Sequence, residues 1–258
     1  MTGNEGISKL PQGQLNDIQH VIAVMSGKGG VGKSSVAALL AVEASRHGYA
    51  VGVMDADITG PSIPRMFGLS QKAETTGLGL VAPKTRSGIR VISLNLLLDH
   101  EDDPVIWRGP LIASAVRQFW TDVIWGDLDY LIVDLPPGTG DAPLTVMQSL
   151  PVEGVVIVSS PQGLAGMVVR KAIKMVKQMD IPVLGVVENM GFVRCPKCGE
   201  NIYPFGEPSG QALAETTNAR YLGSLPLDTD FAKACDSGLV EEYRGEASIS
   251  FANVLGKT

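Results

Sequence analysis

The stretch Gly27-Lys-Gly-Gly-Val-Gly-Lys-Ser34 decides the fold of this chain. It fits the pattern G-x-x-x-x-G-K-[S/T] of a phosphate-binding loop at every fixed position. The glycines let the backbone curl so that successive N–H groups point at phosphate oxygens, and the following helix adds the positive end of its dipole. An apolar run of strand length precedes the stretch and a helical pattern follows it, which is the context that such a loop requires. The sequence therefore predicts that the chain binds a nucleoside triphosphate, with ATP as the expected nucleotide.

Individual side chains of this stretch have separate expected roles. Lys33 would reach the β- and γ-phosphates, the hydroxyl of Ser34 would bind Mg²⁺, and Ser35 could contact the α-phosphate. Lys28 departs from a plain phosphate loop, because a lysine at this position is not needed to hold phosphate in its own chain. The alternative interpretation is a glycine-rich turn with a chance Lys-Ser. The predicted ATP-binding residues of the stretch are Gly27, Lys28, Gly29, Gly30, Val31, Gly32, Lys33, Ser34 and Ser35.

Beyond this loop, short apolar runs alternate with amphipathic stretches of helical spacing. Apolar runs separated by helices predict a mostly parallel, twisted sheet with helices on both faces. The expected fold class is therefore α/β, of the P-loop NTPase type. A hairpin is expected from Leu78–Ala82 and Ile89–Leu94, on either side of the turn Lys84–Gly88. The expected strands are Val21–Met25, Ala50–Met54, Tyr130–Val133, Gly154–Ser159, Pro182–Val187 and Tyr221–Leu225, and the expected helices are Ser34–His47, Leu111–Trp125 and Met167–Met179.

Length and charge limit the domain organisation and the partners. The chain has 258 residues, which suits one α/β domain. We expect a flexible polar tail over residues 1–18 and a single ATPase domain over residues 19–258. The formal net charge of −6 makes nucleic acid and anionic membranes poor partners. No apolar stretch is long enough to span a membrane, and the expected compartment is the cytoplasm, where thiols stay reduced.

Carboxylates follow two of the predicted strands. Asp134 closes an apolar run and could hold Mg²⁺ through water, as the acid of a Walker B strand does. The Pro-Pro-Gly-x-Gly sequence after it is typical of a switch loop. Asp55 and Asp57 end another strand, and because alternate residues of an extended chain point to opposite sides, we expect them to have different roles. The alternative for all three is an ordinary carboxylate in a turn.

A pair of cysteines, Cys195-Pro-Lys-Cys198-Gly, can bring two thiolates to one metal centre. One pair cannot complete a four-sulfur site, and Cys235 is expected to be a small core residue. Four thiolates would be present if two copies of the chain each contributed the pair across a two-fold axis. The chemistry alone allows a [4Fe–4S] cluster or zinc. A thiol–disulfide motif is a third interpretation, but the thioredoxin-like helix context that it usually has is missing.

Several motifs, taken together and in order, resemble one family. The chain is similar to the Mrp/ApbC-type iron–sulfur cluster carrier ATPases, which have a deviant phosphate loop and belong to the MinD/ParA-like superfamily. The resemblance extends from about Val21 to the end of the chain. The motifs that carry it are Met25–Ser34, Asp55–Ser62, Trp107–Pro110, Asp134–Asp141, Glu188–Met190 and Cys195–Cys198.

The resemblance implies roles for residues around the nucleotide. Lys28 would reach across a homodimer to the partner's phosphates and neutralise charge in the transition state. Asp57 would orient the attacking water, and Asp55 would lie nearer the Mg²⁺ ion. Asn189 would read the edge of adenine, although an asparagine is also a routine turn residue. The backbone at Pro226 would line the base.

For the cysteine pair, the resemblance implies a labile [4Fe–4S] cluster bridged between two subunits by Cys195 and Cys198. The homodimer would receive the cluster from an assembly scaffold and hand it to apo-proteins, with ATP binding or slow hydrolysis gating loading or release. Many relatives carry a further N-terminal domain or a four-cysteine site. The N-terminal stretch shows neither, so only the bridging cluster is expected.

Two other functions remain as alternatives. A MinD- or ParA-like spatial-organising ATPase could hold a structural zinc at the cysteine pair. MinD-like proteins use a basic amphipathic C-terminal helix, whereas residues 241–255 are acidic and only briefly apolar. An electron-transfer ATPase like the nitrogenase iron protein takes its cluster ligands from widely separated cysteines and not from a C-P-x-C motif.

Overall fold

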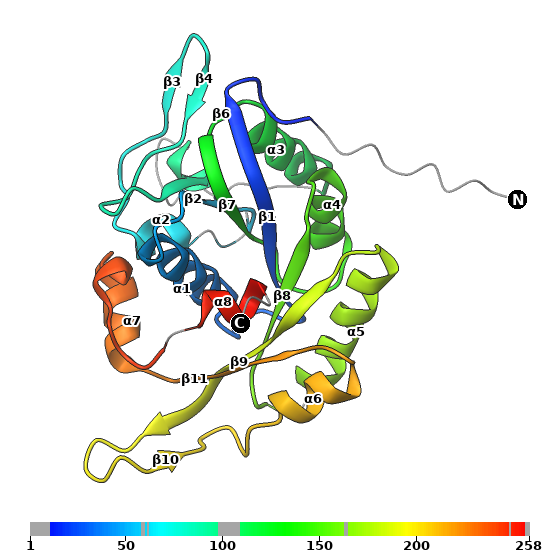
Figure 1. The fold of residues 1–258 in the computed structure, drawn as a ribbon, viewed down its shortest axis with the longest axis vertical. Helices are drawn as coiled ribbons and strands as arrows, with labels where there is room; N and C mark the ends of the chain where they lie inside the picture. Colours follow the sequence, from blue (N-terminus) through cyan, green and yellow to red (C-terminus); the bar gives the residue numbers. More distant parts are fainter. Residues whose placement is uncertain are drawn as a thin grey trace, which may run out of the picture.

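Residues 11–57, 60, 62–97, 109–162, 165–247 and 249–255 are described by the computed structural model of the chain. Its centre is a twisted sheet in the order β10-β9-β8-β1-β7-β2-β5, with β11 also pairing with β9 (Figure 1). All pairs in it are parallel except β10 with β9. Its strands are β1 (Asn16–Ser26), β2 (Val51–Asp55), β5 (Arg90–Ser93), β7 (Gly126–Asp134), β8 (Gly154–Ser159), β9 (Val183–Arg194), β10 (Asn201–Ile202) and β11 (Tyr221–Pro226).

Helices cover both faces of this sheet, as the sequence predicts (Figure 1). One buried cluster joins one face of the sheet to α3 (Gly109–Thr121), α4 (Asp141–Ser149), α5 (Ala165–Gln178) and α6 (Gly210–Thr216). A second cluster joins the other face to α1 (Lys33–Arg46), α2 (Ile63–Met66), α7 (Thr229–Asp236) and α8 (Phe251–Leu255). The short 3₁₀ helices are η1 (Leu94–Leu96) and η2 (Val240–Glu242). Both faces are buried because β1 sends Val21 and Ala23 to one cluster and Ile22 and Val24 to the other.

The expected hairpin of Leu78–Ala82 with Ile89–Leu94 is wrong. The first run contains β4 (Gly79–Val81), which pairs with β3 (Glu74–Thr76) and β6 (Val123–Ile124) in a separate small sheet. The second run contains β5, which joins the main sheet beside β2. Only a single bridge, between Lys84 and Arg90, closes the turn that the sequence suggested.

Three other boundaries differ from the expected ones. β1 begins at Asn16, so residues 16–18 belong to the sheet and not to a tail; the side-chain amide of Asn16 donates to the Val123 carbonyl and accepts from the Trp125 N–H. α3 ends at Thr121, and not at Trp125 as expected, because the chain then enters β6. β9 runs to Arg194, well beyond Val187, because its continuation pairs first with β11 and at its end with β10. Residues 1–10, Trp107 and Arg108 lie outside the described residues.

Candidate functional site

The phosphate loop lies between the end of β1 and the start of α1. Gly30 and Gly32 both have φ of +77°, a left-handed conformation that favours glycine, and Gly32 caps α1. A side chain on Gly27 would meet Val168 of α5 at 2.8 Å. The glycine spacing therefore reflects both the curl of the loop and its close approach to α5, and the loop ends at the N-terminus of a 14-residue helix.

Beside the loop lies a hollow of about 240 Å³. It is bounded by the loop, the segment after β2, α2 and the turn after β7. The residues that line it are Ser26, Gly29, Gly30, Gly32, Lys33, Ser34, Ser35, Asp57, Ser62, Met66 and Pro137. Six of the nine predicted loop residues and Asp57 therefore open onto one space, which has the position that a nucleotide's phosphates would take.

Carboxylates gather around the ammonium group of Lys33. Its Nζ lies 2.6 Å from Oδ1 of Asp134 and 3.5 Å from Oδ2 of Asp57. The hydroxyl of Ser34 donates to Oδ2 of Asp134 at 2.5 Å. Burial raises the pKa of Asp134, and the charge of Lys33 opposes that rise. Ser34 and Asp134 together offer the hard oxygen ligands that Mg²⁺ prefers.

Asp134→Asn is expected to abolish most of the effect of Mg²⁺ on ADP affinity. The substitution removes the carboxylate that would bind the ion, and it also frees Lys33 to meet phosphate. Affinity for metal-free ADP should be unchanged or higher, while the gain on adding Mg²⁺ should fall at least about tenfold. Titration calorimetry with Mg²⁺ and with EDTA measures both quantities. Asp127→Asn, an exposed carboxylate on the same strand, is the matched control; an undiminished Mg²⁺ effect in Asp134→Asn would contradict the assignment.

Asp55 makes contacts that the sequence did not predict. It is fully buried, and its oxygens accept hydrogen bonds from the backbone N–H groups of Asp57, Ser62 and Ile63 and from the hydroxyl of Ser93. Burial, followed by the charge of Asp134, raises its pKa to about 8. Asp55 therefore braces the segment that carries Asp57. β2 ends at Asp55, so strand alternation does not govern Asp57.

Lys28 does not line the hollow. Its Nζ donates to Oε1 of Gln162, in the turn after β8, at 2.5 Å. The adjacent Ser26 hydroxyl donates to the Lys28 carbonyl and fixes the backbone at this position. Gln162 has no motif to mark it, and only the adjacency of β1 and β8 brings it to the loop. The two lysines of the loop thus have different surroundings, since Lys33 faces carboxylates and Lys28 faces an amide.

Asn189 and Pro226, which were both expected to contact the adenine base, lie in different parts of the structure. The Asn189 amide donates to the carbonyl of Val31 at 2.9 Å, and a side chain on Gly32 would collide with it. Asn189 therefore lies directly under the phosphate loop. Pro226 lines another hollow, of about 320 Å³, together with Arg194 and Pro196 of the cysteine hairpin. The structure does not place Pro226 beside the phosphate loop.

Cys195 and Cys198 lie in the turn between β9 and β10, at the tip of a hairpin that extends from the body (Figure 1). The Cys195 N–H donates to the Glu200 carbonyl, and the Gly199 N–H donates to the Cys195 carbonyl. Backbone N–H groups of Cys198 and Lys197 donate to the Cys195 sulfur and lower the pKa of its thiol. Such an arrangement favours thiolates, the form that binds metal.

The turn supplies two ligands only. Within the part of the chain that the structure describes, no group of three or more His, Cys, Asp or Glu residues could hold a metal ion. Cys235 lies on the buried face of α7, and burial raises the pKa of its thiol to about 11, so it is a packing residue as expected. Arg194, which the sequence did not single out, donates to the Gly199 carbonyl and pairs with Glu246 at 3.0 Å, linking the turn to the body.

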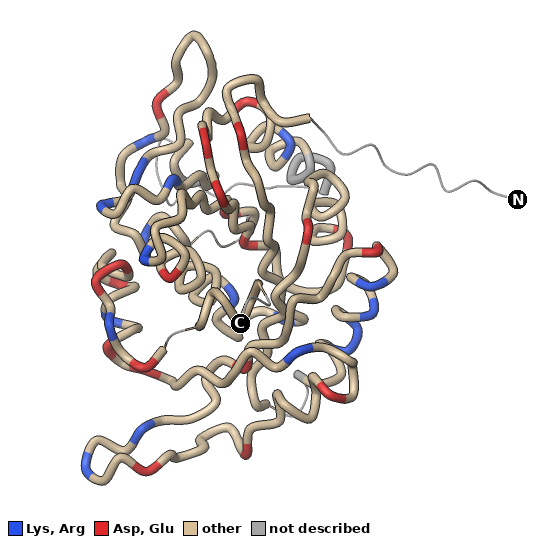
Figure 2. Tube along the Cα trace, in the orientation of Figure 1, with Lys and Arg blue, Asp and Glu red and all other residues tan. Residues whose placement is uncertain are grey.

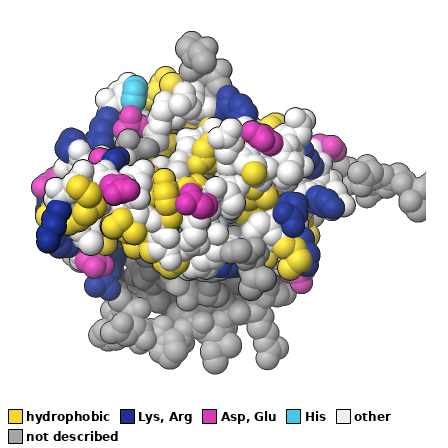
Figure 3. Space-filling view, turned by 90° about the horizontal axis from the view of Figure 1, so that it is seen from below, with side chains coloured by type: hydrophobic (Ala, Val, Ile, Leu, Met, Phe, Trp, Pro, Cys, Tyr) yellow, Lys and Arg dark blue, Asp and Glu magenta, His cyan; other side chains and the backbone are white. Residues whose placement is uncertain are grey.

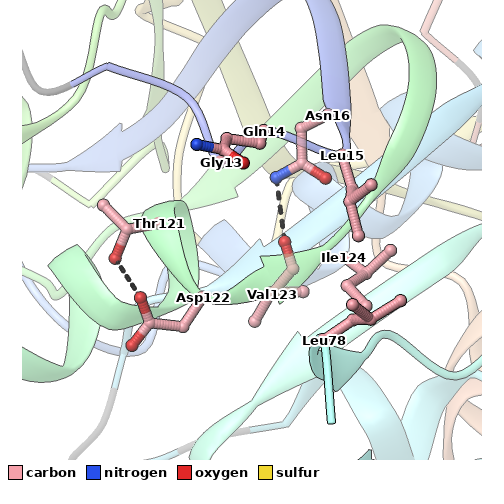
Figure 4. A pocket seen from close by; sticks show the side chains of 9 residues that line it. All are labelled: Gly13, Gln14, Leu15, Asn16, Leu78, Thr121, Asp122, Val123 and Ile124. Carbon is pink, nitrogen blue, oxygen red and sulfur yellow. Dashed lines mark hydrogen bonds between the residues drawn. The ribbon is translucent and has the colours of Figure 1, made fainter. Parts of the chain in front are cut away.

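A different hollow, of about 300 Å³, lies at the opposite end of the strands (Figure 4). It is formed by the start of β1, the β3–β4 turn and β6. Exposed Leu15 and Leu78 line it, and the side chains of Asn16 and Thr121 are hydrogen-bonded to Val123 and Asp122. No convergent set of reactive groups marks this hollow as a second site.

Charge is unevenly distributed over the surface. The exposed face of α5 carries basic residues and the helix contains no acidic ones (Figure 2). These residues are Arg170, Lys171, Lys174 and Lys177. The sequence analysis did not predict this stripe, because apolar residues separate Lys174 and Lys177 from each other and from the pair Arg170-Lys171. On the face shown in Figure 3, basic and acidic side chains are interspersed with hydrophobic ones. None of the described helices is both long and apolar enough to cross a membrane.

Comparison with known proteins finds relatives over nearly the whole chain. The ParA family profile described as NUBPL iron-transfer P-loop NTPase matches residues 17–257. A Clostridium perfringens protein named iron-sulfur cluster carrier protein is 46% identical over 89% of this chain and 84% of its own length. A Kluyveromyces lactis protein named cytosolic Fe-S cluster assembly factor CFD1 is 44% identical over 95% of this chain and 87% of its own length.

Solved structures agree with the fold. A nucleotide-binding protein from Archaeoglobus fulgidus in complex with ADP is 50% identical and has a TM-score of 0.80, covering 89% of this chain and 90% of that one. The septum site-determining protein MinD of Pyrococcus horikoshii, complexed with Mg-ADP, has a TM-score of 0.59 at 18% identity and covers 92% of this chain and 94% of its own. The second likeness concerns the fold alone. Both confirm the predicted α/β, P-loop NTPase architecture.

Proposed function

The chain belongs to the family of NUBPL-type iron-transfer P-loop NTPases, as its Mrp-like motifs predicted, and from this premise we propose that it is an ATP-dependent iron–sulfur cluster carrier. The observation that carries the proposal is a combination within one chain. A phosphate loop whose Lys33 and Ser34 line one hollow together with Asp57 coexists with an exposed Cys-x-x-Cys turn that would supply half of a four-sulfur site. The names of the relatives support the same function.

At the first site, ATP binds with its phosphates against the loop Gly27–Ser34. Lys33 turns from Asp134 to the β- and γ-phosphates. Ser34 and Asp134 would hold Mg²⁺, which would supply positive charge against the phosphates. Asp57, 3.5 Å from the Lys33 ammonium, lies at the edge of the hollow, where a water that attacks the γ-phosphate would be held. The ADP bound to the Archaeoglobus relative supports nucleotide binding here. Asp55 acts indirectly, by bracing the Asp57 segment.

At the second site, a [4Fe–4S] cluster is the cargo. The Cys195 thiol with its two N–H donors and the exposed Cys198 fit a cluster held at a surface. Because the described residues of one chain supply two sulfurs, two copies related by a two-fold axis complete the set of four. An exposed cluster at an interface can be lost easily, which suits a carrier more than a resident redox centre.

The two sites together give a transfer cycle. The homodimer takes up a cluster from an assembly scaffold in the cytoplasm and releases it to apo-proteins, and ATP binding or hydrolysis shifts the dimer between holding and releasing states. Hydrolysis serves as a switch and is expected to be slow. The net charge of −6 supports protein partners over nucleic acid.

Anaerobic reconstitution of the full chain with iron and sulfide tests this function directly. The expected result is a broad charge-transfer absorbance and about four irons and four sulfides per dimer. Absorbance, metal analysis and sizing chromatography measure these quantities together. Zinc bound in place of iron, with no charge-transfer band, would instead favour a spatial-organising ATPase with a structural zinc and would reject the carrier.

A further inference from the structure

The segment that carries the cysteines leaves the sheet along the end of β9 and returns to the body at α6. We call residues 190–209 the cysteine arm: it comprises the end of β9, the cysteine turn, β10 and the return stretch to α6. At its base the N–H of Ser209 donates to Oε1 of Glu188 at 2.9 Å. This hydrogen bond ties the return stretch of the arm to β9, the strand from which the arm departs. The departing strand itself is held to the body farther along, by the Leu227 N–H that donates to the Phe192 carbonyl and by the ion pair of Arg194 with Glu246.

Glu188 is an energetically unfavourable residue at this buried position. It is fully buried, in β9 between Ser159 of β8 and Ser224 of β11. Its second oxygen, Oε2, has no hydrogen-bond partner among the described protein atoms. The space around it is tight, since a side chain on Gly210 would meet the Glu188 Cβ at 2.8 Å. A buried carboxylate with an incompletely satisfied oxygen disfavours folding, so its contribution lies in orientation more than in stability.

The next residue along β9 reaches the other site. Asn189 donates to the Val31 carbonyl of the phosphate loop. Successive residues of a strand project to opposite faces of the sheet. One face of β9 is therefore held by the phosphate loop and the opposite face by the base of the cysteine arm, through two residues that are adjacent in the chain.

Immediately after this pair the backbone is strained. Met190 has φ of +59°, in the left-handed region that non-glycine residues rarely adopt. The pairing of β11 with β9 is also irregular here, since Ser224 is opposite Glu188 and Pro226 is opposite Phe192. A strained residue and a break in register lie between the phosphate-loop contact and the cysteine turn, which makes this point the place where the arm can change direction.

We propose that Glu188 is a positioning residue, which fixes the cysteine arm relative to the phosphate loop so that nucleotide binding changes the setting of Cys195 and Cys198. The inference rests on the proposed nucleotide and cysteine sites and adds the physical link between them. A nucleotide that moves the loop moves Asn189. The Glu188–Ser209 hydrogen bond then moves the return stretch of the arm together with β9. Without this bond, β9 can move while the return stretch keeps its position.

The test measures how fast iodoacetamide alkylates Cys195 and Cys198 in the reduced, metal-free full chain, with and without saturating MgADP. In the wild type we expect the nucleotide to change the rate about fivefold, a usual size for coupling between sites. Glu188→Met keeps the volume but removes the acceptor, and the nucleotide effect should fall below about twofold. Glu188→Gln keeps an acceptor oxygen for Ser209 and should rescue the effect. Glu207→Gln, exposed on the return stretch, is the matched control.

Met190→Gly provides a second variant if Glu188→Met fails to fold. Glycine relieves the left-handed strain and loosens the joint, so the nucleotide effect should again fall below half of the wild-type value while the fold is kept. A full nucleotide effect in folded Glu188→Met, or in Met190→Gly where Glu188→Met does not fold, overturns the inference. Iron plays no part in the measurement. A wild type that binds ADP without any change in alkylation therefore overturns the inference and leaves the carrier function intact, whereas a wild type that binds no ADP overturns both.

Discussion

Cys195→Ser and Cys198→Ser are each expected to abolish cluster binding, from about four irons per dimer to less than a tenth of that amount. The physical reason is symmetry. Where two copies share one cluster, each single substitution removes two of the four sulfur ligands at once. Serine is nearly isosteric, and the turn is held by backbone hydrogen bonds from Cys195 to Glu200 and from Gly199 to Cys195, so it should keep its shape. Iron and sulfide analysis after anaerobic reconstitution provides the measurement.

Nucleotide binding should survive both substitutions, because neither cysteine lines the hollow beside the phosphate loop. Cys235→Ser is the control: its thiol is buried on the core-facing side of α7, and this variant should retain full iron content. The bridging assignment would be rejected if either turn variant still held about four irons per dimer. Loss of iron in Cys235→Ser alone would move the cluster to a different set of ligands.

The phosphate loop could be predicted because its information is local. The spacing of Gly27, Gly32 and Lys33 fixes the curl of the loop, and the flanking strand and helix are short-range patterns. Asp134 could be predicted as well, although it lies 101 residues from Lys33 in the chain. Parallel strands end at one edge of a sheet, and β1 and β7 are neighbours with Val24 opposite Asp134. The rule that parallel strands end at one edge of the sheet therefore placed Asp134 near the phosphate loop without any information about its contact with Lys33.

The hairpin prediction was wrong because the composition of an apolar run does not show which strand it will pair with. Ile89–Leu94 has the composition of a strand, but whether it pairs with the preceding run or with β2 depends on the whole sheet. The predicted end of β9 at Val187 was wrong for a related reason. Glu188 and Asn189 are polar and read as the end of a strand, whereas the structure buries both against partners that are remote in sequence.

The role of Asp55 illustrates a third limit. The family resemblance implied that Asp55 lies nearer the metal, and the sequence held no sign of the four donors that surround its carboxylate. Three of them are backbone N–H groups whose direction depends on the path of the chain into α2. Motifs identify the residues of a site. The different roles of Asp55 and Asp57, however, depend on hydrogen bonds that are present only in the folded chain.

Lys28→Ala is expected to lower the rate of ATP hydrolysis about a thousandfold or more, while changing ADP affinity of the monomer less than about threefold. Lys28 does not line the hollow beside its own loop and donates to Gln162 instead. A cation that leaves its own site free is available to a second copy, where it would neutralise charge that develops in the transition state. Turnover assays and titration with ADP measure the two effects separately. Gln162→Ala, which removes only the hydrogen-bond partner, should cost much less activity.

Mixing two inactive variants decides whether Lys28 acts within its own chain or across the dimer. In a mixed dimer of Lys28→Ala with Asp57→Ala, the Lys28→Ala copy keeps its own Asp57 and receives an intact Lys28 from its partner. That one site should work, and random pairing of equal amounts should restore about a quarter of wild-type activity. If Lys28 served its own nucleotide, every site in the mixture would lack one of the two groups and no activity would return. Recovery of activity would therefore establish that the loop which binds the nucleotide also requires a second copy of the chain, the same assembly that the cysteine pair needs to hold its cargo.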